Sequence, residues 1–202
     1  MNDERLPLPV VDALQLEEAQ RTVLRPGELL ADRNGKLRRL PRFFYRVDSW
    51  ASAQSIQLAE NFALSEFIRV DVREADLLRH FPRYVPCAIS LLAAHLQLFR
   101  REVGLTVHIA ANGGYRTPGH RLTDYASPHC WATAANIYRI GDELLDTEEK
   151  IEQYARIATR VLPGVWIRPY GHEKGMADDH LHLDLAYILA VPRRAASEAE
   201  AA

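Results

Sequence analysis

The chain has few of the features by which a sequence reveals its compartment. It contains two cysteines, Cys87 and Cys130, in 202 residues, too few for a disulfide framework. It has no apolar run approaching the roughly 18 residues of a membrane helix. Its first residues, MNDERLP, lack the basic start and apolar stretch of a secretory signal. We therefore expect a cytoplasmic protein without a membrane segment.

Neither positive nor negative charge predominates in the chain. The chain has 25 basic and 27 acidic residues, a net charge of −2 and a pI near 6.4, and the two signs are interspersed. This distribution predicts no nucleic-acid partner. With 48% hydrophobic residues the chain is long enough for one main core. No pattern in the sequence points to a particular oligomeric state.

Two polar segments carry the functional signal. Residues 127–136 read SPHCWATAAN and residues 179–184 read DHLHLD. In the second segment polar residues alternate with leucines, which predicts a strand with one apolar and one polar face. Zinc accepts imidazole nitrogen and carboxylate oxygen as ligands. We therefore predict that these two histidine-bearing segments supply the ligands of a metal site.

These segments resemble the Hedgehog-like zinc peptidases, which include D-Ala-D-Ala carboxypeptidases, dipeptidases and related phage lysins. The family pattern is Ser-x-His-x-x-Gly-x-Ala-x-Asp, followed later by Asp or Glu, two residues and His. The upstream string GYRTP at 114–118 is similar to the family's Gly-Tyr-Arg-Ser-Pro, and NFALSEF at 61–67 is like its opening. The positions that match the two main motifs are Ser127, His129, Ala134, Asp179 and His182.

The resemblance implies hydrolysis of peptidoglycan-type peptides near a free C-terminus, with Zn²⁺ as cofactor. It implies that His129 and His182 converge to bind that ion. It implies that Asp179 is the general base and that Arg116 stabilises the oxyanion or holds the substrate. Ser127 and Tyr115 would contact the substrate. Plainer interpretations stay open: Arg116 bracing its own turn through a surface salt bridge, and Ser127 as an ordinary turn residue.

Two departures from the family pattern bear on the metal. Asn136 stands where the family has its zinc-binding Asp, so a neutral amide replaces a charged ligand and zinc binding should be weak or lost. Ala132 replaces a Gly, which restricts any backbone position that needs positive φ. His180 is a possible replacement ligand that would complete a three-His set, or else it only lines the cleft.

Two functions follow. The first is an active zinc metallopeptidase of the carboxypeptidase type. The second is a catalytically degenerate family member that acts as a peptide-binding or assembly module with weak or no zinc. Because cell-wall substrate lies outside the cytoplasm, the first function implies release by a lysin-type route or a cytoplasmic recycling role.

The expected fold is α+β, a small mainly antiparallel sheet with helices packed on one side. Residues 1–60 form an N-terminal extension, 61–191 the peptidase-like domain and 192–202 a disordered tail. In the extension we expect a helix within 10–24, a hairpin turn at Asn34-Gly35 and a strand over 42–47. In the domain we expect helices over 86–103 and 148–162, with strands over 105–111, 133–140, 164–170 and around 181–185.

Overall fold

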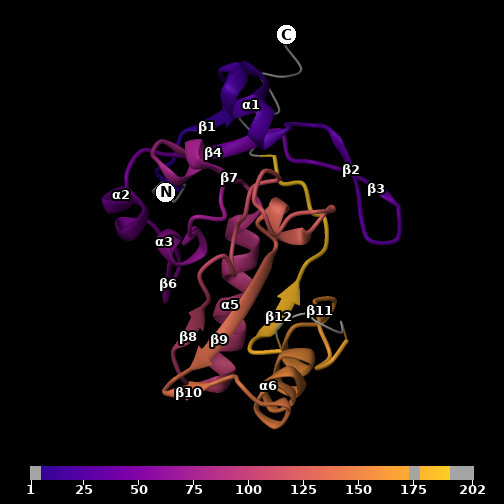
Figure 1. Cartoon of the computed structure of the whole chain (residues 1–202). Coiled ribbons are helices and arrows are strands. Elements are labelled where there is room, and N and C mark those ends of the chain that lie inside the picture. Colours follow the sequence, from indigo (N-terminus) through magenta and orange to yellow (C-terminus); the bar gives the residue numbers. More distant parts are fainter. Residues whose placement is uncertain (1–5, 173–177, 192–202) are drawn as a thin grey trace.

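The computed structural model describes residues 6–172 and 178–191, and in them it shows an α+β fold built on small antiparallel sheets (Figure 1). The main sheet has five strands. Its central strand β9 pairs with β12, β10 and β8, and β11 pairs with the other side of β12. The strands are β8 (Val107–Ile109), β9 (Ala134–Ile140), β10 (Glu143–Leu144), β11 (Trp166–Ile167) and β12 (Leu181–Asp184).

The predicted two-faced character of β12 is confirmed. Leu181 and Leu183 are fully buried in the main core, whereas His182 and Asp184 lie on the opposite face. Buried residues of helices α5 (Ile89–Val103) and α6 (Glu148–Val161) belong to the same core as the leucines. The two long helices therefore cover the apolar side of the sheet and leave its polar side to the candidate site.

Both long helices lie close to their predicted positions. Helix α5 ends at Gly104, which takes the left-handed conformation with φ 67°, as expected of a glycine stop. Helix α6 begins at Glu148, as predicted; Thr147 is its N-cap, and the Thr147 hydroxyl accepts from the backbone N–H of Lys150. Asp146 instead pairs with the Lys150 ammonium at 2.6 Å.

The first sixty residues share a sheet with the rest of the chain. Strands β1 (Val10–Asp12), β4 (Phe43–Val47) and β7 (Arg83–Pro86) pair in that order, so β4 joins the extension to the family-like region. Leu8 and Ile56 are buried in the main core. The extension is therefore packed into the body of the protein.

The helix predicted within 10–24 is only partly correct. Val10 and Val11 pair with Tyr45 and Phe44 on β4, so tertiary pairing of β-branched residues overrides local helical preference. A short 3₁₀ helix η1 (Ala13–Gln15) follows, and α1 spans only Glu18–Leu24.

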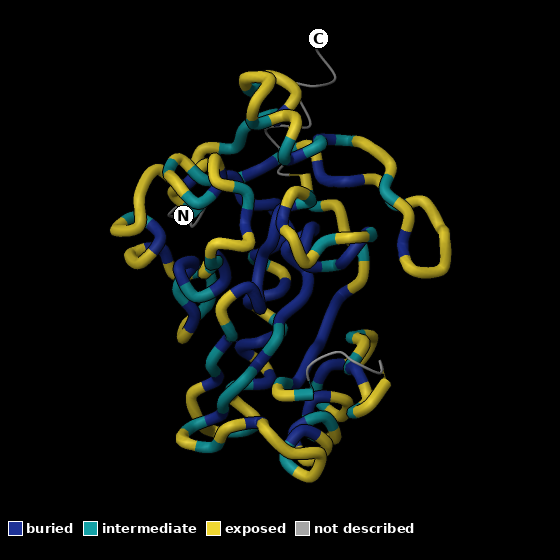
Figure 2. Tube along the Cα trace, viewed as in Figure 1, coloured by how far each residue is buried: buried dark blue, intermediate teal, exposed yellow. Residues whose placement is uncertain are grey.

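The predicted hairpin is confirmed. Strands β2 (Leu29–Ala31) and β3 (Leu37–Arg39) project beyond the rest of the fold (Figure 1). The Asp32 carboxylate accepts from the backbone N–H groups of Asn34 and Lys36, both at 3.0 Å, and Gly35 supplies the positive φ of the turn. Figure 2 shows exposed residues at the hairpin tip and buried ones along the central strands.

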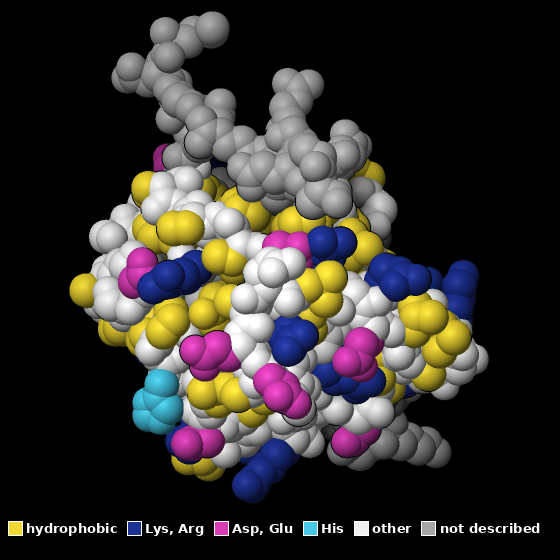
Figure 3. Space-filling model, turned by 90° about the horizontal axis from the view of Figure 1, so that it is seen from above, with side chains coloured by type: hydrophobic (Ala, Val, Ile, Leu, Met, Phe, Trp, Pro, Cys, Tyr) yellow, Lys and Arg dark blue, Asp and Glu magenta, His cyan; other side chains and the backbone are white. Residues whose placement is uncertain are grey.

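The remaining elements connect these parts. They are α2 (Trp50–Ser55), β5 (Gln57–Ala59), β6 (Phe62–Ala63), α3 (Leu64–Phe67), α4 (Asp76–Arg79) and the 3₁₀ helix η2 (Pro128–Trp131). On the face seen in Figure 3, basic and acidic side chains alternate without forming one large patch of either sign. Within the described residues, no helix has the length and apolar character needed to cross a bilayer. The tail predicted over 192–202 lies outside the described residues.

Candidate functional site

His129 and His182 converge, as predicted. His129 lies on η2 and His182 on β12, and their ring centroids are 5.3 Å apart with the planes inclined at 61°. Both residues are buried. Two imidazoles that share one tetrahedral zinc, each at about 2.0–2.1 Å, have ring centres roughly 5 Å apart. The observed spacing is therefore compatible with one ion held by both rings.

His129 is prepared to act as a neutral ligand. Its Nδ1 lies 2.7 Å from the Gly114 carbonyl oxygen, so Nδ1–H donates there and Nε2 keeps its lone pair. Burial, followed by the nearby charges of Arg116 and His182, holds the pKa of His129 well below its ordinary value. Gly114 is required at this point, because a Cβ there would lie 2.1 Å from the backbone oxygen of Phe67.

His182 has two partners that both present oxygen. Its Nε2 lies 3.1 Å from Asp184 Oδ2, and its Nδ1 lies 2.7 Å from Asn136 Oδ1. Burial lowers the pKa of His182, although the Asp184 hydrogen bond opposes this. A neutral imidazole has one N–H, and only that proton can satisfy a carboxylate, so it belongs on Nε2. Nδ1 then turns a lone pair toward the amide.

The Nδ1 lone pair and the Asn136 amide oxygen are both acceptors, and two arrangements would remove the repulsion between them. Either the amide is rotated so that its NH₂ donates to Nδ1, or the amide oxygen and the imidazole nitrogen both bind one cation. The second arrangement places His129, His182 and Asn136 around the same point. It also reproduces the pattern in which a ligating histidine donates its other N–H to a carboxylate, here Asp184.

The two imidazole nitrogens and the amide oxygen are atoms that zinc can bind, but none of these three ligands carries the negative charge that would offset the charge of the metal. Among the described residues, no group of three His, Cys, Asp or Glu side chains is gathered so that it could hold a metal ion. The third donor next to the two imidazoles is the neutral amide of Asn136. We expect such a set to bind zinc more weakly than one completed by a carboxylate.

Arg116 is a buried cation beside the two histidines. It is 9% exposed, and its Nε is buried without a hydrogen-bond partner among the described residues. Burial lowers the pKa of this guanidinium, and its charge contributes to the low pKa of both His129 and His182. The surface salt bridge considered for Arg116 is not seen in the described part of the chain. A buried guanidinium without a counter-charge is costly, which favours an anionic ligand.

Ser127 and Tyr115 occupy different surroundings. Ser127 is buried directly before η2, and its carbonyl accepts from Cys130 N–H at 2.8 Å, which helps to form the turn that carries His129. Tyr115 is also buried, but it lines a separate cavity of about 20 Å³ together with Glu74 and Arg83. The structure thus places Ser127 at the start of the turn that carries His129, and Tyr115 in the lining of a different cavity.

His180 is not brought into a three-His set. Its Nε2 lies 3.0 Å from a guanidinium nitrogen of Arg168, which can only donate, and its Nδ1 lies 2.8 Å from Asp179 Oδ1. Both nitrogens are therefore engaged. The Asp179 side chain is 72% exposed and forms the outer end of this chain of hydrogen bonds. To act as a general base on the histidine pair, Asp179 would have to leave His180.

Two residues beside the site were not assigned a role from the sequence. Asp184 orients His182, and it could have been found by extending the two-residue alternation of the strand by one step. Trp166 pairs in register with Asp184, and its ring lies 5.6 Å from that of His182 and 5.5 Å from that of His172. Trp166 is 42% exposed and forms an aromatic wall at the rim.

The N-terminal hairpin holds the His129 loop in place. Strand β2 accepts a hydrogen bond from the Ala126 N–H at 2.7 Å, and the Trp131 indole donates to the Arg39 carbonyl of β3 at 3.0 Å. Tyr187, which follows β12, packs edge-on against Trp131 at 4.9 Å and donates to the Ala126 carbonyl at 3.0 Å. We call Trp131 and Tyr187 the aromatic clamp, because they tie together the hairpin and both histidine-bearing segments.

Ala132 takes the left-handed conformation with φ 55°, at the position where the pattern that the motifs resemble has Gly. The loop after His129 thus keeps the turn that a glycine would make, at a cost of about 1–2 kcal/mol for an L-residue. The residue is fully buried, so its methyl group is packed while its backbone is strained.

Comparison of the chain with protein-family models, curated proteins and solved structures found no match. The resemblance to the zinc peptidases accordingly rests on the sequence motifs alone.

Proposed function

We propose that this chain is a zinc-dependent metallopeptidase of the carboxypeptidase type that acts on peptidoglycan-type peptides near a free C-terminus. The observation that carries the proposal is the convergence of His129 and His182, from two motifs far apart in the sequence, at a spacing suited to one ion. The neutral state of both imidazoles supports it, since a histidine binds metal only when deprotonated.

In this proposal His129, His182 and Asn136 hold the metal. Zinc, when bound, would supply a water of lowered pKa and polarise the scissile carbonyl. Asp184 fixes the His182 ring through Nε2. Ser127 is buried two residues before His129, and the Trp166 ring packs beside that of His182.

Arg116 has the clearest role toward the substrate. Its buried guanidinium lies close enough to the histidines to affect their pKa, so it can receive the developing oxyanion or the terminal carboxylate of a peptide. Asp179 would take the proton of the attacking water after turning from His180. The His180 to Arg168 hydrogen bond keeps the imidazole in place while that carboxylate moves.

The test is hydrolysis of an acylated D-Ala-D-Ala peptide by zinc-loaded protein, followed as release of D-Ala. We expect activity that disappears in His182→Ala and that falls by about a hundredfold or more in Arg116→Gln. His80→Ala is the matched control, since His80 is 75% exposed and lies outside the site. No hydrolysis by protein shown to contain zinc, or equal hydrolysis by His182→Ala, would remove the proposal.

A second function, a peptide-binding module with little or no zinc, is favoured by two observations. The third donor is the neutral Asn136, and Asp179 is engaged with His180 at the exposed rim. Arg116, whose buried Nε has no hydrogen-bond partner among the described residues, would still attract a peptide carboxylate. This function predicts that chelator-treated protein binds the peptide as tightly as zinc-supplied protein and leaves it intact, whereas binding that requires zinc contradicts it.

A further inference from the structure

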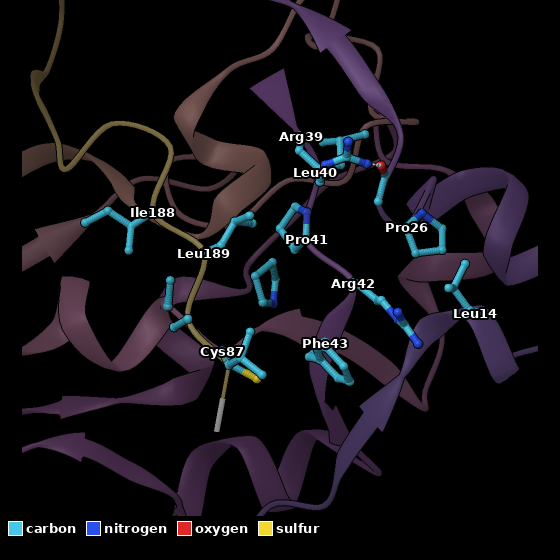
Figure 4. Close-up of a pocket in the computed structure, with 15 residues that line it drawn as sticks. Leu14, Pro26, Arg39, Leu40, Pro41, Arg42, Phe43, Cys87, Ile188 and Leu189 are labelled. Carbon is cyan, nitrogen blue, oxygen red and sulfur yellow. Dashed lines mark hydrogen bonds between the residues drawn. The ribbon is translucent and has the colours of Figure 1, made fainter. Parts of the chain in front are cut away.

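A second cavity, apolar and separate from the histidine site, lies where the N-terminal extension meets the end of the described chain. It has a volume of about 400 Å³ (Figure 4). Residues 39–43 line one side and residues 188–191 the other, with Cys87 at the β7 to α5 junction between them. None of the proposed metal-binding or substrate-contacting residues lines it, although the Arg39 carbonyl also accepts from Trp131 of the aromatic clamp. The role proposed below does not depend on the peptidase function.

The walls are apolar and partly rigid. Pro26, Pro41 and Pro86 contribute rings of fixed backbone conformation, and Leu40 and Cys87 are almost fully buried at the lining. Burial also raises the pKa of the Cys87 thiol to about 12, so this cysteine behaves as an apolar wall group. The volume falls within the range of roughly 300–1,000 Å³ typical of small-molecule sites.

The rim carries one uncompensated positive charge. Arg42 is neutralised by Asp12, to which it makes two hydrogen bonds of 2.9 and 2.5 Å. Arg39 donates only to the Gly27 carbonyl, at 2.7 Å, and has no carboxylate partner among the described residues. Figure 4 shows Arg39 above Leu40 and Pro41, with this bond as a dashed line. The lining of the cavity is thus apolar, and the Arg39 guanidinium adds a positive charge at one edge.

We propose that this pocket binds a small aliphatic carboxylate, with its hydrocarbon chain among the proline, leucine and isoleucine side chains and its carboxylate on Arg39. Guanidinium and carboxylate are matched in charge and geometry. The volume of about 400 Å³ suits one such molecule, whereas a second copy of the chain would need an interface of about 800 Å² on each partner.

The experiment is calorimetric titration of the full chain with decanoate, and with hexanoate, decanol and decyltrimethylammonium for comparison. We expect one decanoate per chain and binding of hexanoate at least about tenfold weaker, because four methylenes fewer are buried. Decanol and decyltrimethylammonium should also bind more weakly. In Arg39→Gln the preference for decanoate over decanol should disappear.

Leu189→Asp tests the location. Leu189 is 47% exposed at the wall, so the variant should fold, and its added anion should weaken decanoate binding at least tenfold. Leu144→Asp is the matched control, since Leu144 is 50% exposed and does not line the pocket; it lies on β10, at the end of the molecule opposite β4 and β7 (Figure 1), and this variant should bind decanoate normally. Absence of saturable binding, equal binding by Leu189→Asp, or self-association of the chain that this variant abolishes would each overturn the proposal.

Discussion

Asn136 and His182 face each other across strands β9 and β12, and the amide oxygen lies 2.7 Å from the imidazole Nδ1. Replacing this amide by a carboxylate should convert a neutral donor set into one that carries a negative charge. We predict that Asn136→Asp raises zinc affinity by about tenfold or more, since the charge of the ligands strongly affects metal affinity. Titration against a coloured chelator measures this change, and equal affinities in the two proteins would contradict it.

Arg116 is buried and has no salt-bridge partner among the described residues, so its charge should favour ligand binding and lower the stability of the fold. We predict that Arg116→Met raises the free energy of unfolding by up to about 2 kcal/mol, because an unpaired charge is removed from the interior. The same variant should lose binding of an acylated D-Ala-D-Ala peptide.

Urea denaturation checks this stability, with Arg101→Met as the control. Arg101 is 62% exposed and pairs with Glu60 on the surface, so its replacement should change stability by less than about 0.5 kcal/mol. A clear loss of stability in Arg116→Met alone would show that the guanidinium has a partner that stabilises it.

The aromatic clamp should contribute to both stability and metal binding. Trp131→Phe keeps a ring but removes the hydrogen bond to the Arg39 carbonyl. We predict a loss of about 1–2 kcal/mol in the free energy of unfolding, together with weaker zinc binding, because the His129 loop is less firmly held. Trp50→Phe, at a ring that is 38% exposed, is the control and should leave zinc affinity unchanged. Zinc affinity that stays constant in Trp131→Phe would limit the clamp to a stabilising role.

His120 should make stability depend on pH. Its Nε2 lies 3.0 Å from Asn112 Oδ1, and its Nδ1 accepts from the Leu122 N–H at 3.0 Å, so the folded state requires the neutral ring. Burial is the main cause that lowers the pKa of His120 below the ordinary 6.5. Below pH 6.5 the unfolded chain binds a proton that the folded state resists. The contribution of neutral His120 to the free energy of unfolding is therefore at its maximum above about pH 6.5, and it is lost as the pH drops through the pKa of His120 in the folded state.

We predict that His120→Gln reduces this loss between pH 7.5 and pH 5.0, as measured by urea denaturation at both values. The buried His129 and His182 act in the same direction, so part of the loss should persist. His80→Gln replaces an exposed ring and should retain the full dependence. Identical losses in His120→Gln and the unaltered protein would show that His120 titrates normally.

Much of the fold could be predicted from local patterns. The alternation of leucine with polar residues identified β12 and its two faces, and the glycine after Val103 marked the end of α5. The prediction was wrong at Val10 and Val11, where pairing with β4 decides the conformation. No local sequence pattern predicts the β1–β4–β7 sheet or the contact between the hairpin and the His129 loop, because each joins segments that are distant in sequence.

The candidate site, like the fold, could be predicted from the sequence only in part. Spacing and residue type predicted the convergence of His129 and His182, because a strand and a turn present them rigidly. They could not predict the orientation of His180, which is set by Arg168 on another segment. Nor could they place Asp179, whose exposed side chain bonds the neighbouring imidazole. The features of the site that could not be predicted are thus those in which a side chain is oriented by a partner that the tertiary structure brings near.

The most direct test of the account is zinc stoichiometry in the unaltered protein, His129→Ala and His182→Ala. Protein purified without chelator and supplied with zinc is dialysed and analysed by atomic emission. We predict one zinc per chain in the unaltered protein and almost none in either variant, because both rings hold the same ion. Absence of zinc from the unaltered protein, or full retention by one of the two variants, would contradict a metal shared by His129 and His182.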